Sequence, residues 1–230
     1  EAGVHLCVVG GEAPLSPPGT VPTLAPDGRF LRNWPAVAAG VAAGRLRRAE
    51  VEREWEAQIV AVREAGLTVT HLDSHQHLHL LPALLPLVVD LARRHGVPFV
   101  RAPRADDPAA LGSPVGAAAR VRARILSLFG ASARRTIAAA GMLEPPRVLG
   151  LAEAGRMTLG RWRVLLDRLP PDGTYEAVLH PGASDPAARA RYPWGYSWEE
   201  EGDALESGAL AALLAGRAVE LLPFSALAAR

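Results

Sequence analysis

The sequence lacks lysine altogether, contains one cysteine, and carries almost no net charge. Its 25 basic residues are all arginines and are balanced by 24 acidic residues, which gives a formal charge of +1. A chain with this balance has no general attraction to nucleic acid or to an anionic membrane. We therefore expect neither of them as a partner.

The single cysteine, Cys7, excludes an internal disulfide and agrees with a reducing compartment, so a cytoplasmic location is expected. Cys7 lies in an apolar run, which favours a buried structural thiol over a nucleophile. No apolar stretch approaches the length of a membrane span, because residues 83–92 are too few and are interrupted by Pro86 and Asp90. No basic-then-apolar leader is seen before the first strand. We therefore expect no transmembrane segment.

Apolar periodicity predicts an alternation of strands and helices along the whole chain. Strands are expected over residues 3–9, 67–72, 97–101, 175–179 and 218–222. Helices are expected over residues 45–64, 84–94, 115–140 with a break near Gly130, 158–169 and 204–215. This order indicates βα units and a mainly parallel sheet, either a barrel or an open doubly wound sheet. No glycine-rich phosphate loop follows a strand, which disfavours nucleotide-binding folds.

One loop and one polar stretch depart from this regular pattern. Residues 10–29 are rich in proline and glycine, and they form a loop long enough to cover a site. The polar stretch, residues 70–80, reads THLDSHQHLHL. Its histidines and its aspartate all stand at odd positions, and they are His71, Asp73, His75, His77 and His79.

In an extended strand these five side chains would share one face, with leucines on the other. Imidazoles and a carboxylate suit a borderline divalent metal such as zinc. The alternative is a polar strand face that is rich in histidine for no chemical reason.

Three further polar residues stand in or at the ends of other expected strands. His5 lies in the first strand, Arg101 ends the third, and His180 ends the fourth, just before a Pro-Gly turn. Functional residues of parallel barrels lie at such strand ends. Metal-assisted hydrolysis of an amide or ester needs an acid for the leaving group, and His180 is placed to supply it. The alternatives are a capped core histidine for His180 and an ordinary strand-end cation for Arg101, which could otherwise orient a carboxylate.

Taken together, THLDSHQHLHLLP, the preceding GVHL, and the following VRAPR and HPG resemble the YdjC-like carbohydrate deacetylase family. That family includes chitooligosaccharide deacetylases and deacetylases associated with hopanoid biosynthesis. The resemblance covers residues 1–230 as a single domain, and its HxDSHxHxH run is the specific part. It implies a distorted β/α barrel of mainly parallel strands that removes N-acetyl groups from amino sugars. A divalent metal is implied, with magnesium favoured by the family and zinc by the ligand types.

The resemblance also implies roles for individual residues. His5 of GVHL and His75 would bind the metal, and His180 of HPG would be the acid. His71, Asp73 and His77 would support these ligands, as metal-bound imidazoles usually require. We expect the strand to end near Ser74, so that His77 and His79 turn away.

The substrate side of the site has two further candidates. Arg101 would contact a carboxylate or the substrate. Trp194 and Tyr196, with Trp198, form an aromatic loop that could stack on a sugar ring or could instead plug the barrel rim.

One departure from the family concerns its Asp-Asp-Phe-Gly motif, which ends the first strand and supplies a metal-binding carboxylate and the base. That motif is absent from the 230 residues, because Asp106-Asp107 precedes proline. We expect the barrel to be N-terminally incomplete by two βα units of about 30 residues each. The open edge favours association, so a homodimer is an expected state.

Two alternative functions follow from the same residues. One is a non-catalytic metal- or glycan-binding remnant of the family. The other is a different metal-dependent amidohydrolase or phosphoesterase, although these usually carry His-x-His in another order.

Overall fold

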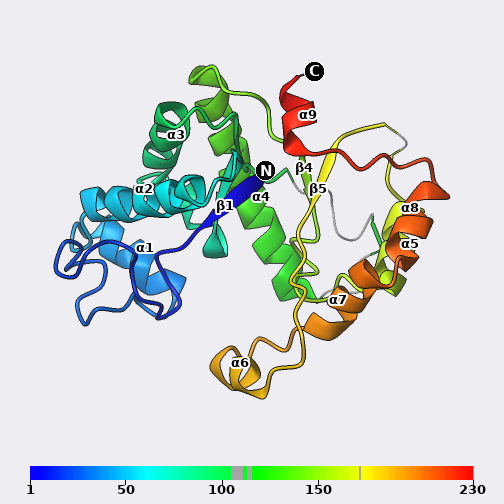
Figure 1. The fold of residues 1–230 in the computed structure, drawn as a ribbon, viewed down its shortest axis with the longest axis horizontal. Coiled ribbons are helices and arrows are strands. Elements are labelled where there is room, and N and C mark those ends of the chain that lie inside the picture. Colours follow the sequence, from blue (N-terminus) through cyan, green and yellow to red (C-terminus); the bar gives the residue numbers. More distant parts are fainter. Residues whose placement is uncertain (105–110, 113–115, 171, 230) are drawn as a thin grey trace. The chain divides into compact units, whose positions relative to one another are not determined.

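The computed structural model describes residues 1–104, 111–112, 116–170 and 172–229. It shows a mixed α/β protein with short parallel strands and many helices (Figure 1). The chain separates into two compact units. The first unit comprises residues 1–102, 129–145 and 222–230, and the second comprises residues 103–128 and 146–221, in each case as far as they are described.

The first unit contains three parallel strands in the order β1-β2-β3, joined by helices. Its elements in chain order are β1 (Ala2–Leu6), α1 (Trp34–Ala42), α2 (Arg48–Glu64), β2 (Val69–Ser74), the 3₁₀ turn η1 (His75–Leu80), α3 (Leu85–Arg94), β3 (Phe99–Val100) and α9 (Phe224–Ala228). Helix α2 packs on β1, and α3 packs on β3. Trp55, Ile59 and Leu91 of these helices are fully buried, so their apolar stripes form the core beside the sheet.

The predicted loop over residues 10–29 is confirmed, and α2 holds it in place. Glu54 accepts a hydrogen bond from the backbone N–H of Leu15 at 2.9 Å, and Glu50 accepts one from Thr23 at 2.7 Å. Both carboxylates are buried. Buried polar groups need partners, and the loop backbone supplies them to both oxygens of Glu54 and to Oε2 of Glu50, so these contacts order the loop.

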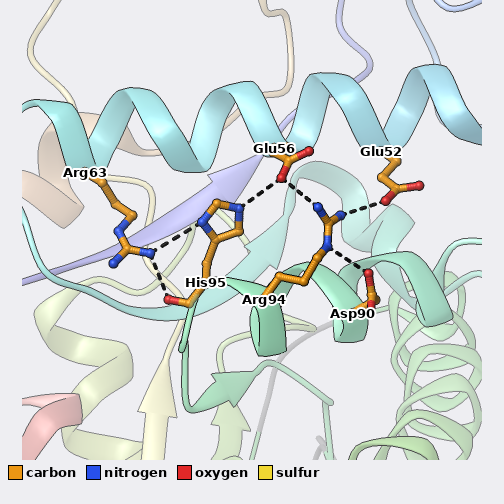
Figure 2. A network of polar contacts seen from close by, with 6 residues as sticks. All are labelled: Glu52, Glu56, Arg63, Asp90, Arg94 and His95. Carbon is orange, nitrogen blue, oxygen red and sulfur yellow. Dashed lines mark hydrogen bonds and ion pairs between the residues drawn. The ribbon is translucent and has the colours of Figure 1, made fainter.

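Helices α2 and α3 are also joined by a polar network at their surface (Figure 2). Arg94 donates to Glu52 and Glu56 of α2 at 2.7 Å each and to Asp90 at 2.9 Å. The ring of His95 lies 3.3 Å from Glu56. Because Arg94 is 39% exposed, each pair is expected to contribute only about 0–1 kcal/mol. The network orients two helices that the apolar core holds together.

The second unit is built around a two-stranded parallel sheet, β4 (Arg147–Leu149) with β5 (Tyr175–Ala177). It contains the helices α5 (Leu159–Leu166), α6 (Pro186–Arg191), α7 (Trp198–Glu206) and α8 (Ala209–Ala215), together with residues 117–128 of α4 (Ala117–Ala139). Its core joins the sheet to α5 and α8 through Leu149, Met157, Trp162, Leu165 and Leu214.

The parallel α/β class is confirmed. Strands β1, β3 and β5 are shorter than the sequence predicts, and β2 has the predicted length but lies two residues later. The helices expected over 45–64, 84–94 and 158–169 are present, and Gly66 and Gly96 end the first two at positive φ values of 83° and 64°. Closure of a barrel stays a prediction, as does the single domain.

Two helical expectations are wrong. Helix α4 (Ala117–Ala139) runs through Gly130 without a break, because one glycine costs only about 1 kcal/mol among strong helix formers. The helix expected over 204–215 is divided into α7 and α8, and Gly208 between them has a φ of 71°.

The last expected strand, over 218–222, is also wrong, and several short elements among the described residues were not expected. The described residues at 218–222 form no strand, and Leu221 is 74% exposed. Its apolar run therefore lacks a partner strand. One of them is α1, which Asn33 caps by accepting from the N–H of Ala36 at 3.1 Å. The others are η1, β4, α6 and α9. Among the helices of the described residues, none has the length and apolar character needed to cross a bilayer.

Gly150, directly after β4, lies close to the backbone of Val178, and this contact leads to a testable prediction. Its φ is 85°, and a Cβ there would lie 2.7 Å from the carbonyl oxygen of Val178. We expect Gly150→Ala to lower the free energy of unfolding by about 2–4 kcal/mol, from backbone strain plus overlap with an immobile atom. Urea denaturation followed by tryptophan fluorescence measures this loss.

The matched control is Gly208→Ala in the same unit. Gly208 has a similar φ of 71° but nothing within 4 Å of an added Cβ. Gly208→Ala should lower the free energy of unfolding only by the cost of a positive φ in alanine, about 1–2 kcal/mol. Equal losses in the two variants would show that the contact with Val178 has no effect.

Candidate functional site

The side chains of His5, Asp73 and Arg101 meet near the carboxyl ends of the three parallel strands. The strand register pairs His5 of β1 with Asp73 of β2, and Arg101 follows β3 directly. The Nδ1 atom of His5 lies 2.9 Å from Oδ1 of Asp73, and the guanidinium of Arg101 donates to Oδ2 of the same carboxylate. Asp73 and Arg101 are nearly buried, with 6% and 10% of their side chains exposed. The carboxylate therefore links a nearly buried cation to an imidazole whose own side chain is 55% exposed.

The contact with Asp73 determines which nitrogen of His5 carries the proton. A carboxylate paired with arginine accepts hydrogen bonds, so Nδ1 of His5 is the donor and Nε2 keeps its lone pair. Desolvation by the surrounding protein, with the nearby charge of Arg101, lowers the pKa of His5 to about 4. At neutral pH His5 is therefore an uncharged imidazole with a ligating nitrogen available, the form that binds metals.

His75 supplies a second imidazole close to the first. Strand β2 ends at Ser74, as expected, and His75 begins the 3₁₀ turn. The ring centres of His5 and His75 are 5.7 Å apart, with an angle of 76° between the planes. Two imidazoles on one zinc ion have ring centres about 5 Å apart, given Zn–N distances of about 2.1 Å. The two rings thus fit a shared divalent ion as a pair of ligands. In the part of the chain that is described, His, Cys, Asp and Glu side chains form no group of three or more placed to hold a metal.

Beneath this polar layer, one step back along the strands, lies an aromatic layer. The ring of His71 stacks on Phe224 of α9 with centres 3.9 Å apart, and Phe224 meets Phe99 edge to face at 5.5 Å. Because side chains two residues apart in a strand share a face, His71 lies on the same side as Asp73. Gly3 is the neighbour of His71 in β1, and a Cβ there would overlap the His71 ring. His71 therefore belongs to the floor of the site.

The two remaining histidines of the polar stretch lie in the 3₁₀ turn. Gln76 and His77 have positive φ values of 54° and 55°, so the chain reverses there and the strand alternation ends. His79 is fully buried and bonds to Ser74 at 2.7 Å and to the carbonyl of Arg101 at 2.8 Å. The single-face picture thus applies to His71 and Asp73 only, because the strand is too short to include the rest.

His180 lies in the second unit, three residues beyond the end of β5. Its backbone N–H donates to Oε2 of Glu201 at 2.5 Å, and the other oxygen of Glu201 accepts from the N–H of Met157 at 2.9 Å. Glu201 is fully buried. The Gly182 N–H donates to the carbonyl of Trp198, the first residue of α7, at 3.1 Å. The first turn of α7 thus holds the His-Pro-Gly segment on both sides of the proline.

The aromatic loop adjoins His180. The ring centre of Tyr196 lies 4.9 Å from that of His180, edge to face, and 5.5 Å from that of Trp194. Tyr196 packs over Gly155, where an added Cβ would overlap its ring, and burial raises the pKa of its hydroxyl. Trp194 is 43% exposed. Tyr196 is therefore fixed by packing, whereas Trp194 presents an accessible ring.

Sequence reasoning did not assign roles to Ser74, His79, Glu201 and Phe224. His79 stands in the histidine run, so its position was visible but its burial was not. Glu201 is the third acid of a Glu-Glu-Glu run, and such runs usually lie on a solvated face. Cys7 is half-buried rather than buried as expected. It donates to the carbonyl of Val9 at 3.0 Å, and burial raises the pKa of its thiol; its structural role stays a prediction.

Comparison with known proteins agrees with this architecture. The family model described as YdjC-like protein matches residues 1–216. A carbohydrate deacetylase from Geobacillus stearothermophilus is 27% identical over 223 residues, covering 96% of this chain and 74% of that protein. A carbohydrate deacetylase from Brevibacillus brevis is 41% identical over 97 residues, 42% of this chain and 36% of its own length. One from Listeria monocytogenes serotype 4a is 34% identical over 114 residues, 50% of this chain and 44% of its own. The chain thus matches less than half the length of these last two relatives.

A solved structure supports the fold. A crystal structure from Enterococcus faecalis V583, of a protein named for cellobiose-phosphate cleavage, has a TM-score of 0.65 and 21% identity. The match covers 98% of this chain and 77% of that one. The resemblance that the histidine run indicates is confirmed by the family match across residues 1–216, and the chain belongs to the YdjC-like family.

Proposed function

We propose that this chain forms part of a metal-dependent carbohydrate deacetylase. The reaction would remove an N-acetyl group from an amino sugar in a chitooligosaccharide or in a glycolipid such as a hopanoid glycoside. The observation that carries the proposal is the set His5, Asp73 and Arg101, with His75 beside it. The relatives named carbohydrate deacetylases support the same reaction class.

In this proposal His5 and His75 would hold a divalent ion through neutral imidazole nitrogens. Such an ion, when bound, polarises a carbonyl and promotes attack by water. Asp73 keeps the proton of His5 on Nδ1, and Arg101 keeps Asp73 charged and in place. The stacked rings of His71 and Phe224 form the floor beneath these groups.

The residues of the second unit would act on the substrate. His180 would give a proton to the leaving amine, with its backbone held by Glu201. Trp194 and Tyr196 would offer aromatic faces to a sugar ring, and His77 would support the turn that carries His75.

The direct test is acetate release from N-acetylated chitooligosaccharides and from N-acetylglucosaminyl lipids, with Mg²⁺ or Zn²⁺ supplied. It is run on the 230-residue chain and on the product of the complete reading frame. Release that stops when the metal is chelated supports the proposal. Metal or glycan binding without release from either protein would contradict it and would favour a binding protein.

Two substitutions separate the proposed roles of the histidines. His180→Gln should lower kcat by about 10²–10⁴-fold, because a general acid contributes that much, and should leave metal affinity unchanged. His75→Gln should instead weaken metal binding by at least about 10-fold. Steady-state kinetics and calorimetric metal titration measure the two effects.

His95→Gln is the matched control, because His95 ends α3 and contacts Glu56 in the surface network (Figure 2). It should change neither quantity. Loss of metal affinity in His180→Gln, or of kcat alone in His75→Gln, would reverse the assignment.

A further inference from the structure

The buried imidazole of His79 connects the end of β2 to the residue that follows β3. Its own backbone N–H donates to Oγ of Ser74 at 2.9 Å, and its Nδ1 lies 2.7 Å from the same oxygen. Its Nε2 lies 2.8 Å from the carbonyl oxygen of Arg101. None of its surface is exposed, so these contacts are made away from water.

The proton positions in this network follow from the chemistry of the partners. A carbonyl oxygen only accepts, so Nε2 of His79 donates to Arg101. The Ser74 oxygen accepts from the His79 backbone, and its hydroxyl proton is then available to Nδ1. His79 is thereby a donor at one nitrogen and an acceptor at the other. Among the natural side chains, only histidine carries a donor nitrogen and an acceptor nitrogen in the same rigid ring.

The hydrogen bond from His79 supplements the pairing of β2 with β3, which is too short to hold both backbone groups of Arg101. Strands β2 and β3 are paired at only two positions, His71 with Phe99 and Leu72 with Val100. The N–H of Arg101 then donates to the carbonyl of Leu72 at 2.9 Å. At the carbonyl of Arg101 the partner is His79, which lies outside the sheet. The backbone of Arg101 is thus held from both sides, once by a strand and once by an imidazole.

From these contacts we propose that His79 is a positioning residue for His5, acting through Arg101 and Asp73. The chain of contacts runs from His79 to the Arg101 backbone, through its guanidinium to Asp73, and on to Nδ1 of His5. Ser74 closes the path, since it follows Asp73 directly and bonds to His79. The proposal rests on the proposed function only in taking His5 as a metal ligand.

The test measures the imidazole of His5 in the metal-free protein by ¹⁵N NMR at neutral pH. The parent chain should show His5 with its proton on Nδ1. His79→Phe fills the cavity but donates and accepts nothing, so the Nδ1–H signature of His5 should be lost and its shifts should average between the two neutral forms. His79→Gln keeps a donor for the Arg101 carbonyl but lacks the rigid ring that also reaches Ser74, so the signature should be measurably weakened without being lost. It also gives a folded variant if His79→Phe does not fold.

Leu24→Ala is the control for a general loss of stability, since Leu24 is fully buried in the long loop, away from this network. It should lower the melting temperature and leave the His5 signals unchanged. Unchanged His5 signals in folded His79 variants, or an equal change in Leu24→Ala, would overturn the proposal. Because no substrate is involved, either result is distinct from a failure to detect deacetylation.

Discussion

Replacing Asp73 by asparagine is expected to lower the free energy of unfolding by about 3–5 kcal/mol, the usual cost of breaking a buried ion pair. The carboxylate is 6% exposed and its partner Arg101 is 10% exposed, so solvent cannot replace the lost charge. The same carboxylate accepts from His5 at 2.9 Å. Asparagine keeps the shape but not the charge that Arg101 and His5 both contact. Urea denaturation of the parent and the variant measures the loss.

Asp90→Asn is the matched control, because it breaks an arginine–aspartate contact that lies in water (Figure 2). Asp90 is 57% exposed and accepts from Arg94 at 2.9 Å, so its loss should cost no more than about 1 kcal/mol. Adding Arg101→Met to Asp73→Asn should restore much of the stability, since it removes the buried cation as well. Equal losses in Asp73→Asn and Asp90→Asn would contradict the burial argument.

The second large effect is expected at Glu201, where Glu201→Gln should cost about 2 kcal/mol. The carboxylate is fully buried and accepts from the backbone N–H groups of Met157 and His180 at 2.9 Å and 2.5 Å. Glutamine has one accepting oxygen, and its amide nitrogen is a donor. One of the two backbone N–H groups would therefore face another donor in a site without water. Urea denaturation reports the loss, and the amide proton shift of His180 reports which bond is broken.

Glu200→Gln is the control on the same helix turn, since Glu200 is exposed. It should leave both the stability and the His180 amide signal unchanged. If Glu201→Gln keeps the parent stability and the parent amide shift of His180, the Glu201 carboxylate is not the acceptor for that N–H group.

The elements of the fold were predictable where local patterns are strong. Helices α2, α3 and α5 have apolar stripes of helical period, with caps or glycines at their ends, and these signals act within a few residues. The failures have separate causes. The run at 218–222 resembles a strand, but a strand needs a partner whose presence local sequence does not encode. Helix α4 continues through Gly130 because its other residues outweigh a single unfavourable one.

The candidate site was predictable to a lesser degree. The histidine run and its aspartate indicate a metal-binding chemistry from residue types alone, and the motif placed His5 and His75 in the same set. The roles of the neighbours were not readable. Whether Glu201 in an acidic run is solvated or buried, and whether His79 faces solvent or a carbonyl, depends on segments distant in the sequence.

The sequence by itself determined the parallel α/β class, the YdjC-like family and the identity of the polar groups, because periodicity and side-chain chemistry are local properties. Only the tertiary structure decided how those groups are used. Parallel pairing set His5 beside Asp73, the carbonyl of Arg101 became the partner of the buried His79, and α9 brought Phe224 onto His71 from a distant part of the sequence. Contacts between segments that are far apart in sequence depend on the folded chain, and no run of eleven residues can specify them.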